Sequence, residues 1–188
     1  MGLTLDGAER LAAEARRAAA AAGFERSSAA AVGRLLRALA SSRPGGRIAE
    51  AGTGFGVGTT WLMSGLGPRG RLVTVELDEE RAAAARRRFL PYPSVRVVSG
   101  DWRAALPPLA PFDLVFLDGG SKQDAVATFA AARPLLRAGG LLLVDDLTPG
   151  RPGPDPVRAV LLGGGDWLGV ELTLTPREAA ILAVPARP

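Results

Sequence analysis

The chain of 188 residues contains no cysteine and no histidine, and Lys122 is its only lysine. Without these residues there can be no thiolate nucleophile, imidazole base, structural zinc site or Ser-His-Asp triad. Any metal ion would have to be held by oxygen atoms, which favours Mg²⁺, Mn²⁺ or Ca²⁺. The candidate catalytic and metal-binding groups are therefore the carboxylates and the single lysine.

Long apolar runs are also missing. The longest are LLLV at 141–144 and alanine-rich segments broken by arginines, far shorter than a membrane span. The N-terminus lacks the basic-then-apolar order of a signal peptide. We therefore expect a cytoplasmic protein without a membrane partner.

The basic isoelectric point gives little support for a nucleic-acid partner, although it does not exclude such a partner. The pI is 10.8, but the net charge is only +4, because almost nothing titrates between neutrality and the pKa of arginine. Three consecutive arginines at 86–88 lie on a predicted surface helix, where an ordinary solvated face explains them.

Apolar runs of strand length recur along the chain from residue 47 onward. They occur at 47–51, 71–77, 94–100, 112–118, 140–146, 169–175 and 178–184. The first five alternate with helical or turn segments, which predicts a parallel sheet covered by helices on both faces. The last two are separated only by Pro176 and Arg177, too short a link for a crossover, so these strands must be antiparallel.

The segments between the strands show helical spacing. Helices are expected at 3–22, at 27–41, after a glycine-rich loop to about 66, at 79–89 and from Ser121 to about Leu136, with a short helical turn at 101–109. The Pro/Gly-rich segment 148–156 is expected to be a loop. The length fits one α/β domain, in which residues 1–45 form N-terminal helices and residues 46–188 form the core.

The sequence EAGTGFGVG at 50–58 follows the first strand and opens a helix, where glycines let a backbone approach a ligand closely. Its spacing does not fit the dinucleotide pattern G-x-G-x-x-G, because Val57 and Thr59 occupy the sixth positions counted from Gly52 and Gly54. Glu50 precedes the glycines and suits a ligand with an ammonium or sulfonium group. A carboxylate here is unfavourable for a pyrophosphate.

Acidic residues also close the next two strands. Glu76 ends the second strand, where a carboxylate can accept hydrogen bonds from ribose hydroxyls. Asp101 and Trp102 follow the third strand, and they offer an acid for an adenine amino group and an indole to lie against its ring. All these residues fall at the carboxyl ends of strands, where open α/β sheets bind ligands.

With the motifs AEAGTGFG, VTVELD, FDLVFLD and LLLVDDLTPG in this order, the chain resembles class I S-adenosylmethionine-dependent methyltransferases, specifically the catechol O-methyltransferase-like small O-methyltransferases. The resemblance covers nearly the whole chain. It implies a Rossmann-like methyltransferase fold, with a seven-stranded, mostly parallel sheet, an antiparallel C-terminal hairpin and two N-terminal helices. It also implies S-adenosylmethionine as the cofactor.

The resemblance assigns cofactor-binding roles to a set of residues at the strand ends. They are Glu50, Gly52, Thr53, Gly54, Gly56, Gly58 and Thr59 on the methionine side, Glu76 and Leu77 at the ribose, Asp101 and Trp102 at the adenine, and Asp118 near the sulfonium. Gly58 stands where relatives often have a serine that binds the cofactor carboxylate, which leaves that contact to the backbone or to Thr59.

Three further carboxylates end neighbouring strands. Asp118 closes the fourth strand, and Asp145 and Asp146 close the fifth, so all three should converge and favour a hard cation. The alternative is that Asp145 or Asp146 caps the turn that follows. The O-methyltransferases that the chain resembles bind Mg²⁺ with an aspartate and an Asp-Asn pair at these places, and Asp146 replaces the asparagine.

Lys122 is a candidate general base, together with Asp118 as a second catalytic residue. The sequence SKQD predicts a capping box with Ser121 at the N-cap and Asp124 at N3, which would place Lys122 at the first helical position. The helix dipole and a nearby cation would favour the neutral amine that a base requires. Relatives place this lysine three residues after the metal aspartate, whereas here the spacing is four. The alternative is an ordinary surface lysine.

The pattern as a whole predicts an S-adenosylmethionine-dependent O-methyltransferase that acts on a small hydroxylated or phenolic acceptor with help from Mg²⁺ or another hard divalent cation. Two alternatives stay open, a tRNA or other nucleic-acid methyltransferase of the same family and a non-catalytic S-adenosylmethionine-binding protein. Relatives are often dimers, so a homodimer is also left open.

Overall fold

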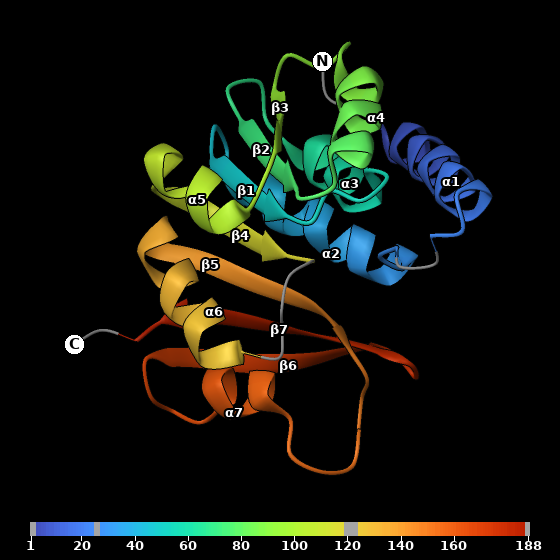
Figure 1. Ribbon diagram of the computed structural model, residues 1–188. Coiled ribbons are helices and arrows are strands. Elements are labelled where there is room, and N and C mark those ends of the chain that lie inside the picture. The colour runs from blue at the N-terminus through green and yellow to red at the C-terminus, as the bar shows by residue number, and fades with distance from the viewer. Residues whose placement is uncertain (1–2, 25–26, 119–123, 187–188) are drawn as a thin grey trace.

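The computed structural model describes residues 3–24, 27–118 and 124–186. Within these ranges the chain forms a seven-stranded sheet with the strand order β3-β2-β1-β4-β5-β7-β6 (Figure 1). The strands are β1 (Arg47–Ala51), β2 (Arg71–Glu76), β3 (Val95–Ser99), β4 (Phe112–Leu117), β5 (Leu136–Leu147), β6 (Trp167–Thr175) and β7 (Glu178–Pro185). The first five pair in parallel, whereas β7 is antiparallel to both β5 and β6. The predicted mostly parallel sheet with an antiparallel C-terminal hairpin is confirmed.

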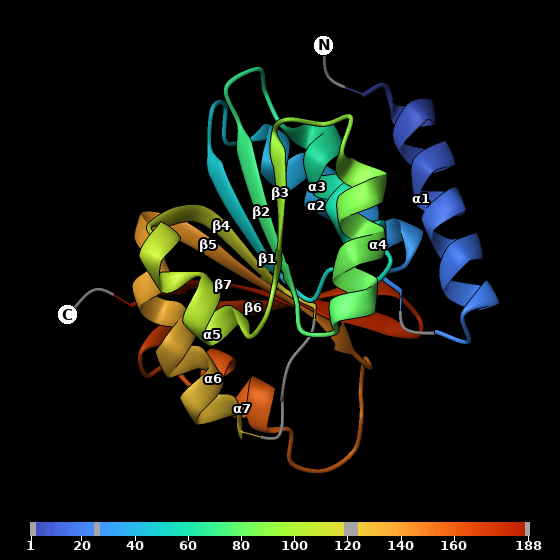
Figure 2. The ribbon, with the colours of Figure 1, turned by 45° about the horizontal axis from the view of Figure 1, so that its top comes forward.

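Helices cover both faces of this sheet, as predicted (Figure 2). They are α1 (Leu5–Ala21), α2 (Ala30–Ser41), α3 (Val57–Gly65), α4 (Glu79–Phe89), α5 (Trp102–Ala105), α6 (Ala125–Ala132) and α7 (Pro156–Leu162). Residues of α1 to α4 share one hydrophobic core with one face of the sheet, and residues of α5 to α7 share a second core with the other face. The sheet is therefore buried between two helical layers, which explains why its central strands are continuous apolar runs.

The two N-terminal helices are present and pack on α3. Helix α1 turns a stripe of small residues, Ala8, Ala12, Ala15 and Ala19, toward the core, and all four are buried. The spacing of three to four residues puts these alanines on one face of the helix. Each described helix is too short or too polar to cross a lipid bilayer.

Helix α6 is shorter than the predicted helix from Ser121 to about Leu136. It begins at Ala125 and ends at Ala132, and a 3-10 turn that contains Pro134 follows it. Asp124 is the N-cap, and its carboxylate accepts a hydrogen bond from the backbone N–H of Ala127 at 3.0 Å. The prediction that Asp124 is the N3 residue is therefore wrong for α6, because its own side chain caps the helix. The predicted positions of Ser121 at the N-cap and Lys122 at the first helical position fall on residues outside the described ranges.

Two other elements differ from the sequence prediction. Strand β5 begins at Leu136, before the predicted start at residue 140, because Leu136 already pairs with Phe112 of β4. The register of the two strands then shifts between Phe112 and Leu114, and Gly139 in this irregular part of β5 has a φ of 74°. Helix α7 follows the 148–156 loop, where the pattern predicts no helix. Asp155 caps it by accepting hydrogen bonds from the backbone N–H groups of Val157 and Arg158.

Candidate functional site

A cavity of about 630 Å³ opens at the carboxyl ends of the parallel strands. Many of the predicted site residues line it, namely Gly52, Thr53, Gly54, Gly58, Glu76, Leu77, Asp101, Trp102, Asp118 and Asp146. Glu50, Gly56, Thr59 and Asp145 are not part of its wall. The strand ends therefore bring most of the predicted residues to one place, and the others lie behind it.

The loop after β1 is shaped by close packing. Gly56 caps α3 with a φ of 89°, and a Cβ atom there would lie 2.6 Å from the ring of Phe89. Gly58 lines the cavity, and a Cβ atom there would lie 2.5 Å from Oε1 of Glu50 and 3.1 Å from Phe116. Gly56 is therefore required by the turn, and Gly58 by the carboxylate behind it.

Glu50 is fully buried behind this loop. Its Oε2 accepts hydrogen bonds from the hydroxyls of Thr59 at 2.5 Å and Thr74 at 2.6 Å, and Oε1 has no hydrogen-bond partner among the described residues. Burial raises the pKa of Glu50 to about 7, although the two hydroxyls act in the opposite direction. A cation in the cavity next to Gly58 would stabilise the ionised form of this carboxyl group.

The neighbouring hydroxyls connect Glu50 with the cavity wall. The hydroxyl oxygen of Thr74 lies 2.6 Å from that of Thr53, which lines the cavity. Thr59 is fully buried and its hydroxyl is directed at Glu50, so the structure does not bring this side chain to the cavity.

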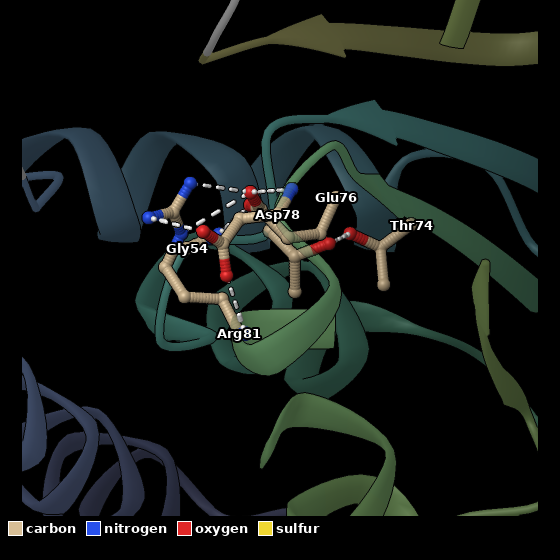
Figure 3. Close-up of polar contacts among 6 residues, drawn as sticks. Gly54, Thr74, Glu76, Asp78 and Arg81 are labelled. Carbon is tan, nitrogen blue, oxygen red and sulfur yellow. Dashed lines mark hydrogen bonds and ion pairs between the residues drawn. The ribbon is translucent and has the colours of Figure 1, made fainter. Parts of the chain in front are cut away.

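Glu76 is the second acidic residue of the cavity, and Figure 3 shows its contacts. The backbone N–H of Gly54 donates to Oε2 at 2.8 Å, and the backbone N–H of Asp78 donates to Oε1 at 3.0 Å. Arg81 adds hydrogen bonds from Nε at 3.2 Å and Nη2 at 2.8 Å, both to Oε1. The side chain of Glu76 is thus held in one orientation.

Asp101 and Trp102 lie together at the start of α5. Asp101 is exposed and caps the helix by accepting a hydrogen bond from the backbone N–H of Arg103 at 2.8 Å. The indole of Trp102 is buried, and the guanidinium of Arg103 lies over it at 4.8 Å. Arg103 also donates to the hydroxyl of Thr128 at 2.9 Å. One face of the indole is therefore already covered, and the contacts of Asp101 and Trp102 with an adenine ring stay predictions.

The three predicted metal ligands converge as expected. Carboxylate oxygens of Asp118, Asp145 and Asp146 lie within 4.8 Å of one another. Between Val144 and Leu147 the pairing of β5 with β7 shifts register, and Asp146 takes a left-handed φ of 61°. This irregularity lies within the last residues of β5, which ends at Leu147, and it brings carboxylates of both adjacent aspartates close to Asp118 at the end of β4.

One carboxyl group of this cluster, that of Asp118, has an unusually high pKa. Burial raises the pKa of Asp118 well above its usual range, and the charges of Asp146, Asp145 and Glu50 raise it further. A hard cation among the three carboxylates would remove this repulsion. The donor set consists of oxygen atoms, and it fits Mg²⁺.

Ser28 was not identified from the sequence, although it contacts this cluster. It is buried, its hydroxyl donates to Oδ2 of Asp118 at 3.1 Å, and its carbonyl accepts a hydrogen bond from Arg16 at 2.7 Å. Phe24, Phe55 and Arg81 also line the cavity without having been predicted. No local signal marks Ser28, because its contact joins segments 90 residues apart.

Lys122, the predicted base, lies outside the described residues, as does Ser121. Asp118, the other predicted catalytic residue, is half-buried at the end of β4. The role of Lys122 therefore stays a prediction.

Comparison with known proteins connects this site with methyl transfer. The model of a protein family with the description "methyltransferase domain" matches residues 49–147, which is more than half of the chain. The chain is 40% identical to a catechol O-methyltransferase of Mycobacterium tuberculosis over 123 residues, which cover 63% of this chain and 56% of that protein. It thus spans just over half the length of the curated relatives that it matches.

Solved structures show the same similarity over a larger share of the chain. An O-methyltransferase from Bacillus cereus in complex with S-adenosylhomocysteine superposes with a TM-score of 0.78 and 25% identity, covering 94% of this chain and 91% of that one. The O-methyltransferase TomG from Streptomyces achromogenes, in complex with S-adenosylmethionine, gives a TM-score of 0.75 with 28% identity over 94% and 90% of the two chains. This chain belongs to the methyltransferase domain family, and it shares its fold with these two O-methyltransferases of known structure.

Proposed function

We propose that this protein transfers a methyl group from S-adenosylmethionine to a hydroxyl oxygen of a small hydroxylated or phenolic acceptor, with help from a divalent cation, preferably Mg²⁺. The observation that carries the proposal is the cluster of Asp118, Asp145 and Asp146 beside the cavity of the glycine loop. We further propose that residues 1–45 and 46–188 act as one domain.

The cavity fits the cofactor in size and in chemistry. Its volume of about 630 Å³ lies within the usual range of small-molecule sites, which is about 300–1,000 Å³. Behind Gly58, Oε1 of Glu50 accepts no hydrogen bond from any described residue, which suits the cationic end of the cofactor. We propose that Glu76 offers its carboxylate to the ribose and that Asp101 and Trp102, which line the same cavity, contact the adenine. The cofactor, when bound, supplies an electrophilic methyl group.

Asp118, Asp145 and Asp146 would hold the cation. A divalent cation held there would supply positive charge, which would lower the pKa of an acceptor hydroxyl nearby and make its oxygen a better nucleophile. Ser28 fixes the orientation of Asp118 by donating a hydrogen bond to it. Asp146 adds a negative charge at the place of the asparagine in the related enzymes, which should strengthen the attraction for the cation.

Lys122 is our proposed acceptor of the hydroxyl proton. It follows Asp118 by four residues, and positive charge from a cation nearby would favour its neutral amine. With the acceptor oxygen in line with the methyl group and its proton transferred to Lys122, the O–CH3 bond would form while the S–CH3 bond breaks, and S-adenosylhomocysteine would leave.

Turnover of a panel of catechols, with formation of S-adenosylhomocysteine as the readout, tests the proposal. Activity should require Mg²⁺, disappear with EDTA and return with excess Mg²⁺. Asp118→Asn should lose activity, whereas Asp166→Asn, an exposed residue before β6, should not. Activity that is insensitive to EDTA would remove the carboxylate cluster from the mechanism.

A further inference from the structure

We propose that Arg81 determines how the ribose of the cofactor is recognised, because it occupies one oxygen of Glu76 and leaves the other to a single ribose hydroxyl. This inference rests on the proposed function, since it takes Glu76 as the residue that binds the ribose. A carboxylate that was free at both oxygens could instead accept hydrogen bonds from both hydroxyls.

The two oxygens of Glu76 differ in the number of donors that they accept. Oε1 receives three, one from the backbone of Asp78 at 3.0 Å and two from Arg81 at 3.2 Å and 2.8 Å (Figure 3). Among the residues that the structure describes, Oε2 receives one, from the backbone of Gly54 at 2.8 Å. Since a carboxylate offers about four lone-pair sites in all, room for a further donor remains at Oε2.

Arg81 is held in place from several sides. Its backbone N–H donates to Oδ1 of Asp78 at 2.8 Å, and its Nη1 lies 3.5 Å from Oδ2 of the same residue. Its guanidinium also lies over the ring of Phe24 at 5.5 Å. If Arg81 withdrew, it would leave the buried carboxylate of Glu76 without its counter-charge, which is unfavourable. We therefore expect Arg81 to stay at Glu76 when the cofactor binds.

The second ribose hydroxyl then meets a different group. Arg81 lines the cavity beside Glu76, and its side chain is 33% exposed. A guanidinium can donate a hydrogen bond but cannot accept one. The ribose would therefore donate one hydroxyl to Oε2 of Glu76 and offer the oxygen of the other hydroxyl to Arg81.

The two hydroxyls should consequently contribute unequally to affinity. Loss of a hydrogen bond to a buried charged group weakens binding by about tenfold or more. Loss of a contact with a partly solvated guanidinium should weaken it only about threefold, because solvent replaces the contact. Removing the hydroxyl that binds Glu76 should therefore weaken cofactor binding about threefold more than removing the hydroxyl that contacts Arg81.

Calorimetry with S-adenosylhomocysteine and its 2′-deoxy and 3′-deoxy analogues tests this inference. In the wild-type protein, the two deletions should reduce affinity by factors that differ about threefold or more. In Arg81→Met the two factors should converge, because Oε1 becomes accessible to the second hydroxyl. Arg87→Met, an exposed arginine on the same helix, should keep the wild-type difference.

Equal losses for the two analogues in the wild-type protein would overturn the role of Arg81, and so would an unchanged difference in Arg81→Met. If Arg81→Met does not fold, the wild-type comparison decides alone. Absence of any binding of S-adenosylhomocysteine would overturn the proposed function itself, whereas binding with equal losses overturns only the inference about Arg81.

Discussion

Replacing Glu50 by glutamine should make the stability of the protein less dependent on pH. In the folded protein burial raises the pKa of Glu50 to about 7, whereas the ordinary value is 4.5. Between these values the folded state binds more protons than the unfolded state, so the free energy of unfolding falls as the pH rises. The difference between the two pKa values corresponds to about 3.5 kcal/mol of stability in total, at about 1.4 kcal/mol per pH unit.

Urea denaturation without cofactor at pH 5 and pH 8 measures this effect. Most of the change falls within this interval, so the wild-type protein should lose about 2.5 kcal/mol more than Glu50→Gln. Glu80→Gln, at an exposed position in α4, should behave like the wild type. Equal pH dependence in the wild type and Glu50→Gln would refute the assignment of a raised pKa to this buried carboxyl group.

The same titration should appear in cofactor binding with the opposite trend. If the cationic end of the cofactor binds only the ionised form of Glu50, affinity should rise about tenfold from pH 6 to pH 8, since the ionised fraction rises by about that factor. Titrations of S-adenosylmethionine into wild type and Glu50→Gln measure the difference, and ionisations of the ligand itself cancel in this comparison. Parallel pH profiles would remove Glu50 from the cofactor site.

Three other substitutions give separate predictions. Gly58→Ser should weaken binding of S-adenosylhomocysteine and lower the melting temperature, because the new Cβ atom would lie 2.5 Å from Oε1 of Glu50. Gly165→Ser should change neither property, because a Cβ atom there would have no other atom within 4 Å. Asp146→Asn removes one negative charge and keeps an oxygen ligand, so about tenfold more Mg²⁺ should be needed for half-maximal activity; an unchanged requirement would place the cation elsewhere. Lys122→Arg keeps the charge but cannot release its proton, so the rate should fall at neutral pH; an unchanged rate and pH profile would exclude the proposed base.

The parts of the fold that follow local patterns were predictable. The apolar runs located all seven strands, and the two-residue link at Pro176 and Arg177 identified the antiparallel hairpin. Convergence of Asp118 with Asp145 and Asp146 was predictable as well, because parallel neighbours bring their carboxyl ends together. Strand positions leave a hydrophobic pattern in the sequence, and the convergence followed once β4 and β5 were taken as parallel neighbours, which the structure confirms.

Other features depend on contacts that have no such signal. Ser28 reaches Asp118 from the segment between α1 and α2, and only the three-dimensional packing shows this contact. Arg81 could have been suspected from its place in the first turn after Glu76, but its preference for one carboxylate oxygen is a matter of atomic geometry. Helix α7 had a readable start signal in Asp155 and Pro156, an N-cap followed by proline, which the glycines and prolines around it obscured.

In our proposal the cavity at the strand ends is the cofactor site of a methyltransferase. Calorimetric titration of S-adenosylhomocysteine into the wild-type protein and into Glu76→Gln tests it most directly. We predict saturable binding of one ligand per chain in the wild type and an affinity at least about tenfold lower in the variant, because Glu76 loses its charge as a hydrogen-bond acceptor. No binding to the wild type at millimolar ligand, or equal affinity in the two proteins, would contradict the account.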